Sequence, residues 1–207
     1  KDVLPNKAAQ PTEAPTQQAQ TTQAAPTEQP TPEPDLVQQL LEEMTLEQKV
    51  GQLFLVRPDS LDLSQTQDQI NDAKADGVTE LTDAMRQTLA EYPVGGVVIF
   101  GKNLESPQQI TQFLDDLQQA SDTLLFTAVD EEGGLVARLA NNAAFDLPQY
   151  ESAAAVGTSG NPEDARAMGR TIGGYLKEYG FNLDFAPVAD VNTNPDNPVI
   201  GTRAFSS

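Results

Sequence analysis

Three adjacent acidic residues, Asp130, Glu131 and Glu132, stand directly before a Gly-Gly pair, and Arg138 follows shortly after. Such a run is a poor strand or helix start, and we expect it to form a rigid turn that presents oxygen acceptors to hydroxyl groups. The apolar stretch 124–129 comes immediately before it, so Asp130 falls at the end of an expected strand. The run is therefore either part of a site for a hydroxyl-rich ligand or a solvated acidic loop, and the residue types favour neither.

A second candidate site follows the apolar stretch 183–188, where Asp190 again falls at a strand end. The segment 197–205 comes next and contains Arg203. A guanidinium held in such a loop can form forked hydrogen bonds with sugar hydroxyls or pair with nearby carboxylates. Arg203 is therefore interpreted either as a ligand-binding residue or as half of a structural Arg–Asp pair that locks the loop.

The composition excludes several classes of function. The 207-residue chain has no Cys and no His, so it offers no thiolate site, no His-ligated zinc and no His-based triad. Its 31 acidic and 12 basic residues give a formal net charge of -19, which repels phosphate backbones. We expect no nucleic-acid partner, no cofactor and no metal.

Two other ligand classes lack support. The pattern Asp190-x-Asn192-x-Asn194 resembles the start of a calcium loop, but Pro195 stands where Gly is needed and Gly201 stands where a bidentate Glu is needed. No G-x-G-x-x-G motif follows an expected strand, so a dinucleotide-binding domain is not indicated.

Helix start and stop signals divide the chain into elements. Apolar residues at helical spacing predict a helix over 36–44, and Thr45 with Gln48 predicts a capping box for a second, short helix. Three longer helices are expected, and they are marked by the stretch 82–91, by the Ser106-Pro107 start, and by the Asn161-Pro162 start with a stop at Gly180.

Four short apolar stretches predict buried strands over 51–56, 95–100, 124–129 and 183–188. The polar segment 58–92 resembles an insertion between the first two. Strands that are apolar throughout and alternate with helices indicate a parallel sheet covered by helices. A doubly wound sheet and a (β/α)8 barrel fit this periodicity equally well.

Four stretches together resemble the family 3 glycoside hydrolases, in the β-N-acetylhexosaminidase branch rather than the β-glucosidase branch. These stretches are 44–54 (MTLEQKVGQLF), 94–103 (VGGVVIFGKN), 129–139 (VDEEGGLVARL) and the FAPVADVN…NPVIGTRAF segment of 185–205. They occur in order and with plausible spacing, and the resemblance covers residues 37–207.

The resemblance implies that residues 35–207 form the N-terminal half of a (β/α)8 barrel. In the family, an Asp matching Asp130 binds hydroxyls of the non-reducing N-acetylglucosamine, helped by Arg residues matching Arg138 and Arg203. We add Asp190 as a fourth substrate-binding candidate and expect all four to converge at the carboxyl ends of the strands. The family hydrolyses with retention through a covalent glycosyl-enzyme. The family's nucleophilic Asp lies on a later strand, and the acid/base of the β-N-acetylhexosaminidase branch is a His on a loop beyond the fourth strand, so no catalytic residue is expected in this stretch.

Residues 1–34 are built almost entirely from Pro, Gln, Thr, Ala and Glu. Such a segment buries too little apolar surface to offset its ordering entropy, so we expect an extended spacer. A spacer of this kind can hold a domain away from a membrane or wall, through a lipid anchor or other envelope attachment upstream, although a plain interdomain linker fits as well. The expected location is extracellular or on the cell surface, as a lipoprotein of a bacterial envelope.

Two functions from different classes stay open. One is an exo-β-N-acetylhexosaminidase that removes N-acetylglucosamine from cell-wall or related glycans. The other is a non-catalytic carbohydrate-binding or cell-surface module that uses the same pocket, and a family 3 β-glucosidase is a further alternative. A Lys-His pair followed later by a strand-end Asp, further along the gene, would favour the enzyme.

Overall fold

A computed structural model describes residues 35–206 of the chain. The predicted spacer over 1–34 lies outside the described residues, and the domain boundary at residue 35 stays a prediction. Contacts between backbone segments define one compact unit that begins at Val37. All elements below belong to this unit, apart from the first residue of its first helix.

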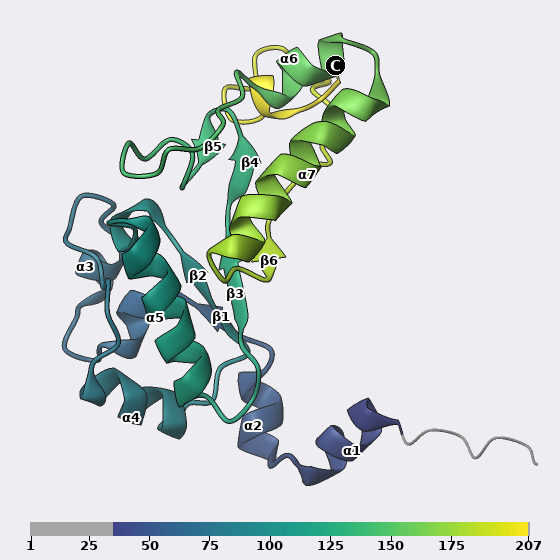
Figure 1. Ribbon diagram of the computed structural model, residues 1–207. Coiled ribbons are helices and arrows are strands. Elements are labelled where there is room, and N and C mark those ends of the chain that lie inside the picture. The colour runs from purple at the N-terminus through teal and green to yellow at the C-terminus, as the bar shows by residue number, and fades with distance from the viewer. Residues whose placement is uncertain (1–34, 207) are drawn as a thin grey trace, which may run out of the picture. The chain divides into compact units, whose positions relative to one another are not determined.

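A four-stranded sheet forms the centre of the unit (Figure 1). Its strands are β1 (Leu55–Val56), β2 (Gly96–Ile99), β3 (Phe126–Val129) and β6 (Leu183–Asp184), and they are hydrogen-bonded in the order β1-β2-β3-β6. All three pairings are parallel, as the apolar strand pattern predicts. The strands therefore follow one another in chain order, which is the arrangement of successive strands in a barrel wall.

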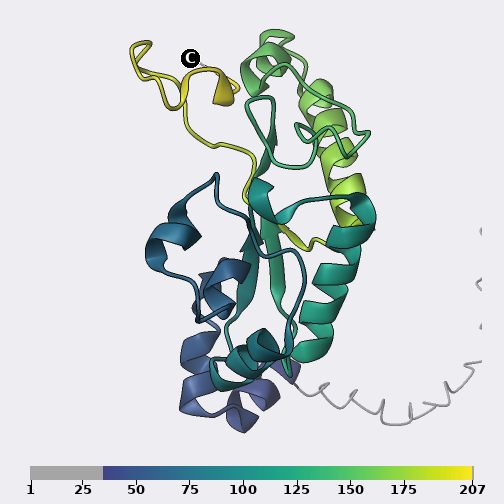
Figure 2. The same ribbon diagram turned by 90° about the vertical axis from the view of Figure 1, so that its left-hand side faces the viewer.

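Two of the predicted long helices cover one face of the sheet. They are α5 (Pro107–Ala120) and α7 (Pro162–Glu178), which lie along the same side in Figure 2, while the segment after β6 lies on the other side. The third, α4 (Asp83–Glu91), contacts α5. The predicted stripe of α5 is buried in the core, and its members are Ile110, Phe113, Leu114 and Leu117.

The predicted caps of these helices are present. The hydroxyl of Ser106 accepts a hydrogen bond from the backbone N–H of Gln109. Asn161 caps α7 through the N–H of Glu163, and Gly180 takes a φ of +95° where α7 stops. Gly tolerates this left-handed conformation, which explains why the helix ends there.

The first predicted strand is too long. Residues 36–54 instead form α1 (Leu36–Glu43), α2 (Leu46–Gly51) and a turn, and only Leu55–Val56 pair with the sheet. The predicted Thr45 capping box is present, and it starts a helix that continues through Gly51. Residues 52–54 form a turn after that helix, in which the N–H groups of Leu53 and Phe54 donate to the carbonyls of Val50 and Gly51. The N–H of Gly95 then donates to the carbonyls of Gly51 and Phe54. The helix predicted over 36–44 exists, but none of its residues is buried.

The polar segment between β1 and β2 carries short helices. They are η1 (Pro58–Leu61) and α3 (Gln67–Asn71), and α4 follows them. Outside this segment, a 3-10 turn, η2 (Gly101–Asn103), comes directly after β2. Thr66 and Gln69 form a second capping box at α3. The segment therefore behaves as the predicted insertion, with its own local hydrogen bonds.

The acidic run does not form the expected turn. Glu131–Gly133 form strand β4, which pairs antiparallel with β5 (Val136–Ala137), and β3 runs directly into β4 in Figure 1. The turn of this hairpin is made by Gly133 and Gly134, whose φ angles are +82° and +68°. Two smaller helices, α6 (Ala153–Thr158) and η3 (Gly201–Arg203), complete the elements of residues 35–206.

The fourth strand is also shorter than predicted. Residues 183–188 were expected to pair throughout, but β6 ends at Asp184, and only the N–H of Phe185 adds one more bond, to the carbonyl of Val129. Pro187 has no N–H to donate, so the ladder cannot continue through it.

Over residues 35–206 no helix is long and apolar enough to span a membrane. Within the same residues, no group of three or more His, Cys, Asp or Glu side chains is placed to hold a metal ion.

Candidate sugar-binding site

Three side chains follow the strands of the sheet directly. Arg57 comes after β1, Phe100 after β2 and Asp130 after β3. Because the strands are parallel, these three residues lie along the same edge of the sheet, where parallel α/β folds place their active sites. Each is half-buried, so it is held by the fold and still meets solvent.

Asp130 and Arg138 form an ion pair at this edge. The distance between Arg138 Nη2 and Asp130 Oδ2 is 3.0 Å, and their side chains remain 33% and 27% exposed. Arg138 reaches Asp130 because the β4–β5 hairpin folds its strand back over the acidic run. The pair offers a hydrogen-bond acceptor and a donor to the same ligand.

Arg203 pairs with Glu132 instead of an Asp. Its Nε lies 2.8 Å from Glu132 Oε2, and its Nη2 lies 2.6 Å from Oε1, which is a forked, two-bond contact. The hydrogen bond to Glu132 is the largest cause that raises the pKa of Arg203, and the charges of Asp130 and Asp190 raise it further. Arg203 therefore forms a carboxylate pair, with Glu132 in place of the expected Asp, and whether it also binds a ligand stays a prediction.

Asp190 is exposed and contributes to the site through its charge near Arg203. Two of the four predicted residues are thus joined by a direct bond, Arg138 and Asp130. Arg203 belongs to the same electrostatic cluster through Glu132, and Asp190 lies at its margin. The role of all four in binding a sugar stays a prediction.

Glu131 belongs to the acidic run that the sequence analysis singled out, but its burial and its partners were not predicted. Its carboxyl group is fully buried and accepts hydrogen bonds from the N–H groups of Leu139 (2.8 Å) and Ala140 (2.9 Å), and from the hydroxyl of Tyr175 (2.8 Å). These bonds tie the hairpin to α7. The signal that could have indicated a buried partner was the position of Tyr175 on the buried stripe of α7, because a buried Tyr needs a partner for its hydroxyl.

Asp184, at the end of β6, was also missed. Its Oδ1 accepts a hydrogen bond from the N–H of Glu131 at 3.0 Å, which joins β6 to the acidic run. The pKa of Asp184 is raised to about 6, mainly by burial. The hydrogen bond from Glu131 lowers this pKa, and the charges of Glu131, Asp130 and Glu132 add to its rise. At neutral pH Asp184 is therefore ionised, although its burial and the neighbouring carboxylates disfavour the negative charge.

This pKa predicts how Asp184→Asn changes stability. Since the folded pKa lies above the ordinary value of 3.8, the folded protein binds a proton more tightly between about pH 4 and pH 6. The contribution of Asp184 to the free energy of unfolding must then fall as pH rises through this window. Asn keeps the acceptor oxygen and removes the charge, so in the full-length protein Asp184→Asn should raise the urea midpoint at pH 7.5 and leave it nearly unchanged at pH 4.5.

The matched control is Asp115→Asn on the exposed surface of α5, which removes one negative charge without touching the site. Both variants reduce the overall negative charge equally. If the two variants shift the urea midpoint at pH 7.5 by the same amount, the burial of Asp184 has no effect on stability and the prediction is wrong.

The comparison with protein families identifies the chain. The model of the glycosyl hydrolase family 3 N-terminal domain matches residues 45–207. The chain belongs to glycosyl hydrolase family 3. The matched region contains the whole sheet and all the site residues described above, and the resemblance predicted from the four sequence stretches is confirmed.

Similar curated proteins of family 3 carry hexosaminidase names. The chain is 35% identical over 134 residues to beta-hexosaminidase A of Pseudoalteromonas piscicida, which covers 62% of this chain and 22% of that protein. It is 34% identical over 131 residues to the beta-hexosaminidase of Thiobacillus denitrificans, covering 61% of this chain and 36% of that protein. The chain therefore matches about a fifth to a third of the length of these relatives.

Solved structures of family 3 have the same fold. A β-N-acetylglucosaminidase from Paenibacillus sp. superposes with a TM-score of 0.63 and 34% identity, covering 78% of this chain and 27% of that one. NagZ from Neisseria gonorrhoeae in complex with N-trifluoroacetyl-D-glucosamine gives a TM-score of 0.56 and 26% identity, covering 62% of this chain and 38% of that one. The predicted fold class, the N-terminal half of a (β/α)8 barrel, is confirmed.

Proposed function

We propose that the full-length protein containing this chain is a retaining exo-β-N-acetylhexosaminidase, which removes terminal N-acetylglucosamine from cell-wall or related glycans. The observation that carries the proposal is the cluster of two Arg–carboxylate pairs, Asp130–Arg138 and Glu132–Arg203, at the edge of the sheet where the strands end. The hexosaminidase names of the family 3 relatives support the choice of sugar.

The chemistry of the cluster suits a pyranose. Each sugar hydroxyl can donate one hydrogen bond and accept others, so neighbouring hydroxyls are best met by a carboxylate and a guanidinium side by side. Asp130 and Arg138 provide this combination with both side chains partly open to solvent. Glu132 and Arg203 use their forked contact to hold the segment after β6 against the β4–β5 hairpin.

The chain itself is proposed to supply sugar binding and not the chemical steps. Retaining hydrolysis needs a nucleophile that forms a glycosyl-enzyme and an acid/base that protonates the leaving group. In the β-N-acetylhexosaminidase branch of the family the acid/base is a His, and these 207 residues contain none. We place both groups elsewhere in the full-length protein.

The location is proposed to be the cell surface, with the chain held at a bacterial envelope by its N-terminal segment. The support is compositional: the Pro/Gln/Thr-rich residues 1–34 are typical of a spacer, and the net charge of -19 suits an exposed, highly soluble domain. Release of the full-length protein from cells by lipase or protease treatment would test this location.

The assay compares two aryl glycosides with the full-length protein. An aryl N-acetyl-β-glucosaminide should be hydrolysed, and the matched β-glucoside should be hydrolysed at least about 100-fold less efficiently, because a site built to contact the acetamido group leaves polar groups unpaired without it. NMR of the first product should show the β-anomer. Binding of N-acetylglucosamine without turnover would indicate the non-catalytic module, and preference for the glucoside would indicate a β-glucosidase.

A further inference from the structure

An aromatic ring at the end of β2 contacts two guanidinium groups. The Cζ atom of Arg57 lies 4.4 Å from the centroid of the Phe100 ring, and the Cζ atom of Arg138 lies 5.7 Å from it. Both distances are within the range of attractive cation–π contacts. The ring therefore links the residue after β1 to the Arg138 of the sugar-binding cluster.

The guanidinium of Arg138 has few other contacts that fix its plane. Its Nη2 donates to Asp130, but its Nε is buried and has no hydrogen-bond partner among the described residues. A guanidinium usually fixes its plane through several hydrogen bonds, and here one end lacks them. The Phe100 ring is the contact that can hold the plane of Arg138 on that side.

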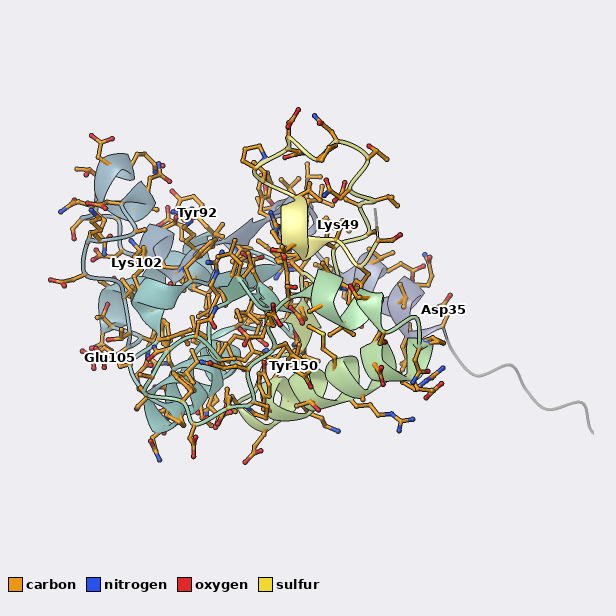
Figure 3. All side chains as sticks on the ribbon, turned by 90° about the horizontal axis from the view of Figure 1, so that it is seen from above. Asp35, Lys49, Tyr92, Lys102, Glu105 and Tyr150 are labelled. Atoms are coloured by element: carbon orange, nitrogen blue, oxygen red, sulfur yellow. The ribbon has the colours of Figure 1, made fainter. Side chains whose placement is uncertain are left out.

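A buried polar network fixes the backbone of Phe100. Its N–H donates to Asn103 Oδ1 at 3.1 Å, and the amide of Asn103 donates to Asp59 Oδ2 at 3.0 Å and to the carbonyl of Val78 at 2.9 Å. Asp59 and Asn103 are fully buried, and Lys102, labelled in Figure 3, pairs with Asp59 at 3.1 Å. The backbone position of Phe100 is therefore fixed by buried hydrogen bonds and a buried ion pair.

The segment between β1 and β2 fixes Arg57. Its Nη1 donates to the carbonyl of Ile70 at 2.8 Å, at the end of α3. The segment between β1 and β2 therefore reaches the sugar-binding cluster through one chain of contacts, from Ile70 to Arg57, to Phe100 and then to Arg138.

We propose that Phe100 is a positioning residue for sugar binding, which holds the guanidinium of Arg138 beside Asp130, and that Arg57 supports it in this role. The inference rests on the proposed function, since it assigns these two residues to the affinity of that same site. Neither residue needs to touch the sugar. Their effect is transmitted through Arg138.

The test is a double-mutant cycle on the full-length protein, with kcat and KM for the aryl N-acetyl-β-glucosaminide as readouts. Phe100→Leu should lower kcat/KM by about 3- to 30-fold, mainly through KM, since it removes an attractive contact that orients a binding group. In an Arg138→Gln background the same change should alter kcat/KM by less than about twofold. Phe100→Tyr keeps the ring and should restore the wild-type KM.

Arg57→Gln provides a second arm that keeps the Phe100 side chain and removes the guanidinium that supports it. It should raise KM by about two- to tenfold, for the same reason. The matched control is Arg86→Gln on α4, whose partly exposed guanidinium pairs with Asp116 at 3.8 Å, and it should leave both kcat and KM unchanged.

Additive effects of Phe100→Leu and Arg138→Gln would overturn the inference, as would a loss that Phe100→Tyr fails to restore. Should Phe100→Leu fail to fold, the same cycle with Arg57→Gln decides in its place. A wild-type protein that binds or hydrolyses no N-acetylglucosaminide would instead contradict the proposed function, and the inference would fall with it. If the wild-type protein hydrolyses the substrate but the effects of Phe100→Leu and Arg138→Gln are additive, the inference is wrong and the proposed function stands.

Discussion

Asp130→Ala is expected to lower kcat/KM for an aryl N-acetyl-β-glucosaminide by about 100- to 10 000-fold in the full-length protein. The range follows from two charged hydrogen bonds to sugar hydroxyls at about 1.5–3 kcal/mol each, with about 1.4 kcal/mol for each factor of ten. The substitution also leaves Arg138 without its only ion-pair partner among residues 35–206. Steady-state kinetics of the purified variant measures the effect.

The control for this prediction is Asp116→Ala on α5, which removes a carboxylate that pairs with Arg86 at the surface. An exposed pair of this kind contributes little to stability, so turnover should match the wild type. If Asp130→Ala also keeps the wild-type kcat/KM, Asp130 does not bind the sugar and must be removed from the site.

The 207-residue chain on its own is expected to hydrolyse no glycoside and to lack a cooperative unfolding transition as a monomer. Within residues 35–206, β1 and β6 are edge strands that pair on one side only, and unpaired edges favour association with other chains. A barrel removes such edges by closing its sheet. Large apolar side chains beside the strands are also exposed, and these are Leu53, Phe54, Leu124, Phe126 and Phe185.

A cavity adds to the uncovered apolar surface. It has a volume of about 560 Å3 and lies between α7 and the segment after β6. Its walls include the apolar side chains of Met168, Ile172, Pro187 and Phe205, and also three carboxylates of the candidate site, Glu131, Glu132 and Asp184. Apolar surface left in water costs on the order of 25 cal/mol per Å2, and the stability of a domain is only about 5–15 kcal/mol. Surface of this extent can therefore remove the margin that keeps the chain folded.

The measurement is thermal unfolding, light scattering and aryl-glycoside hydrolysis of the isolated chain beside the full-length protein. Aggregation, dimers or a broad transition are expected for the chain, with no turnover above the buffer rate. A cooperative monomeric transition would contradict the folding part of this prediction. Turnover by the isolated chain would contradict the placement of the catalytic groups elsewhere.

The sequence was sufficient to predict the helices that carry local signals. The α5 and α7 helices have Ser106 and Asn161 as N-caps and a Pro at their first position, as expected. These signals can be recognised in the sequence because each involves only a few neighbouring residues. The parallel sheet followed from strands that are apolar on both faces. Strand lengths were predicted poorly, since pairing in 51–56 and 183–188 depends on neighbours and not on the apolar stretch itself.

The contacts inside the site could not be predicted from local patterns. Glu132 and Arg203 are far apart in the sequence, and nothing near either residue indicates the forked bond between them. The acidic run was expected to be a turn because adjacent carboxylates disfavour a strand, but Glu131 gains three hydrogen bonds by entering one. The contact of Phe100 with Arg138 likewise exists only after the strands are placed side by side.

The central claim is that a terminal N-acetylglucosamine binds at the edge of the sheet where Asp130 and Arg138 meet. The most direct test is a crystal structure of the full-length protein with N-acetylglucosamine bound. We expect sugar hydroxyls within about 3 Å of Asp130 and Arg138, with the ring of Phe100 still against the guanidinium. A sugar bound away from these two side chains, with Asp130 and Arg138 paired only to each other, would contradict the account.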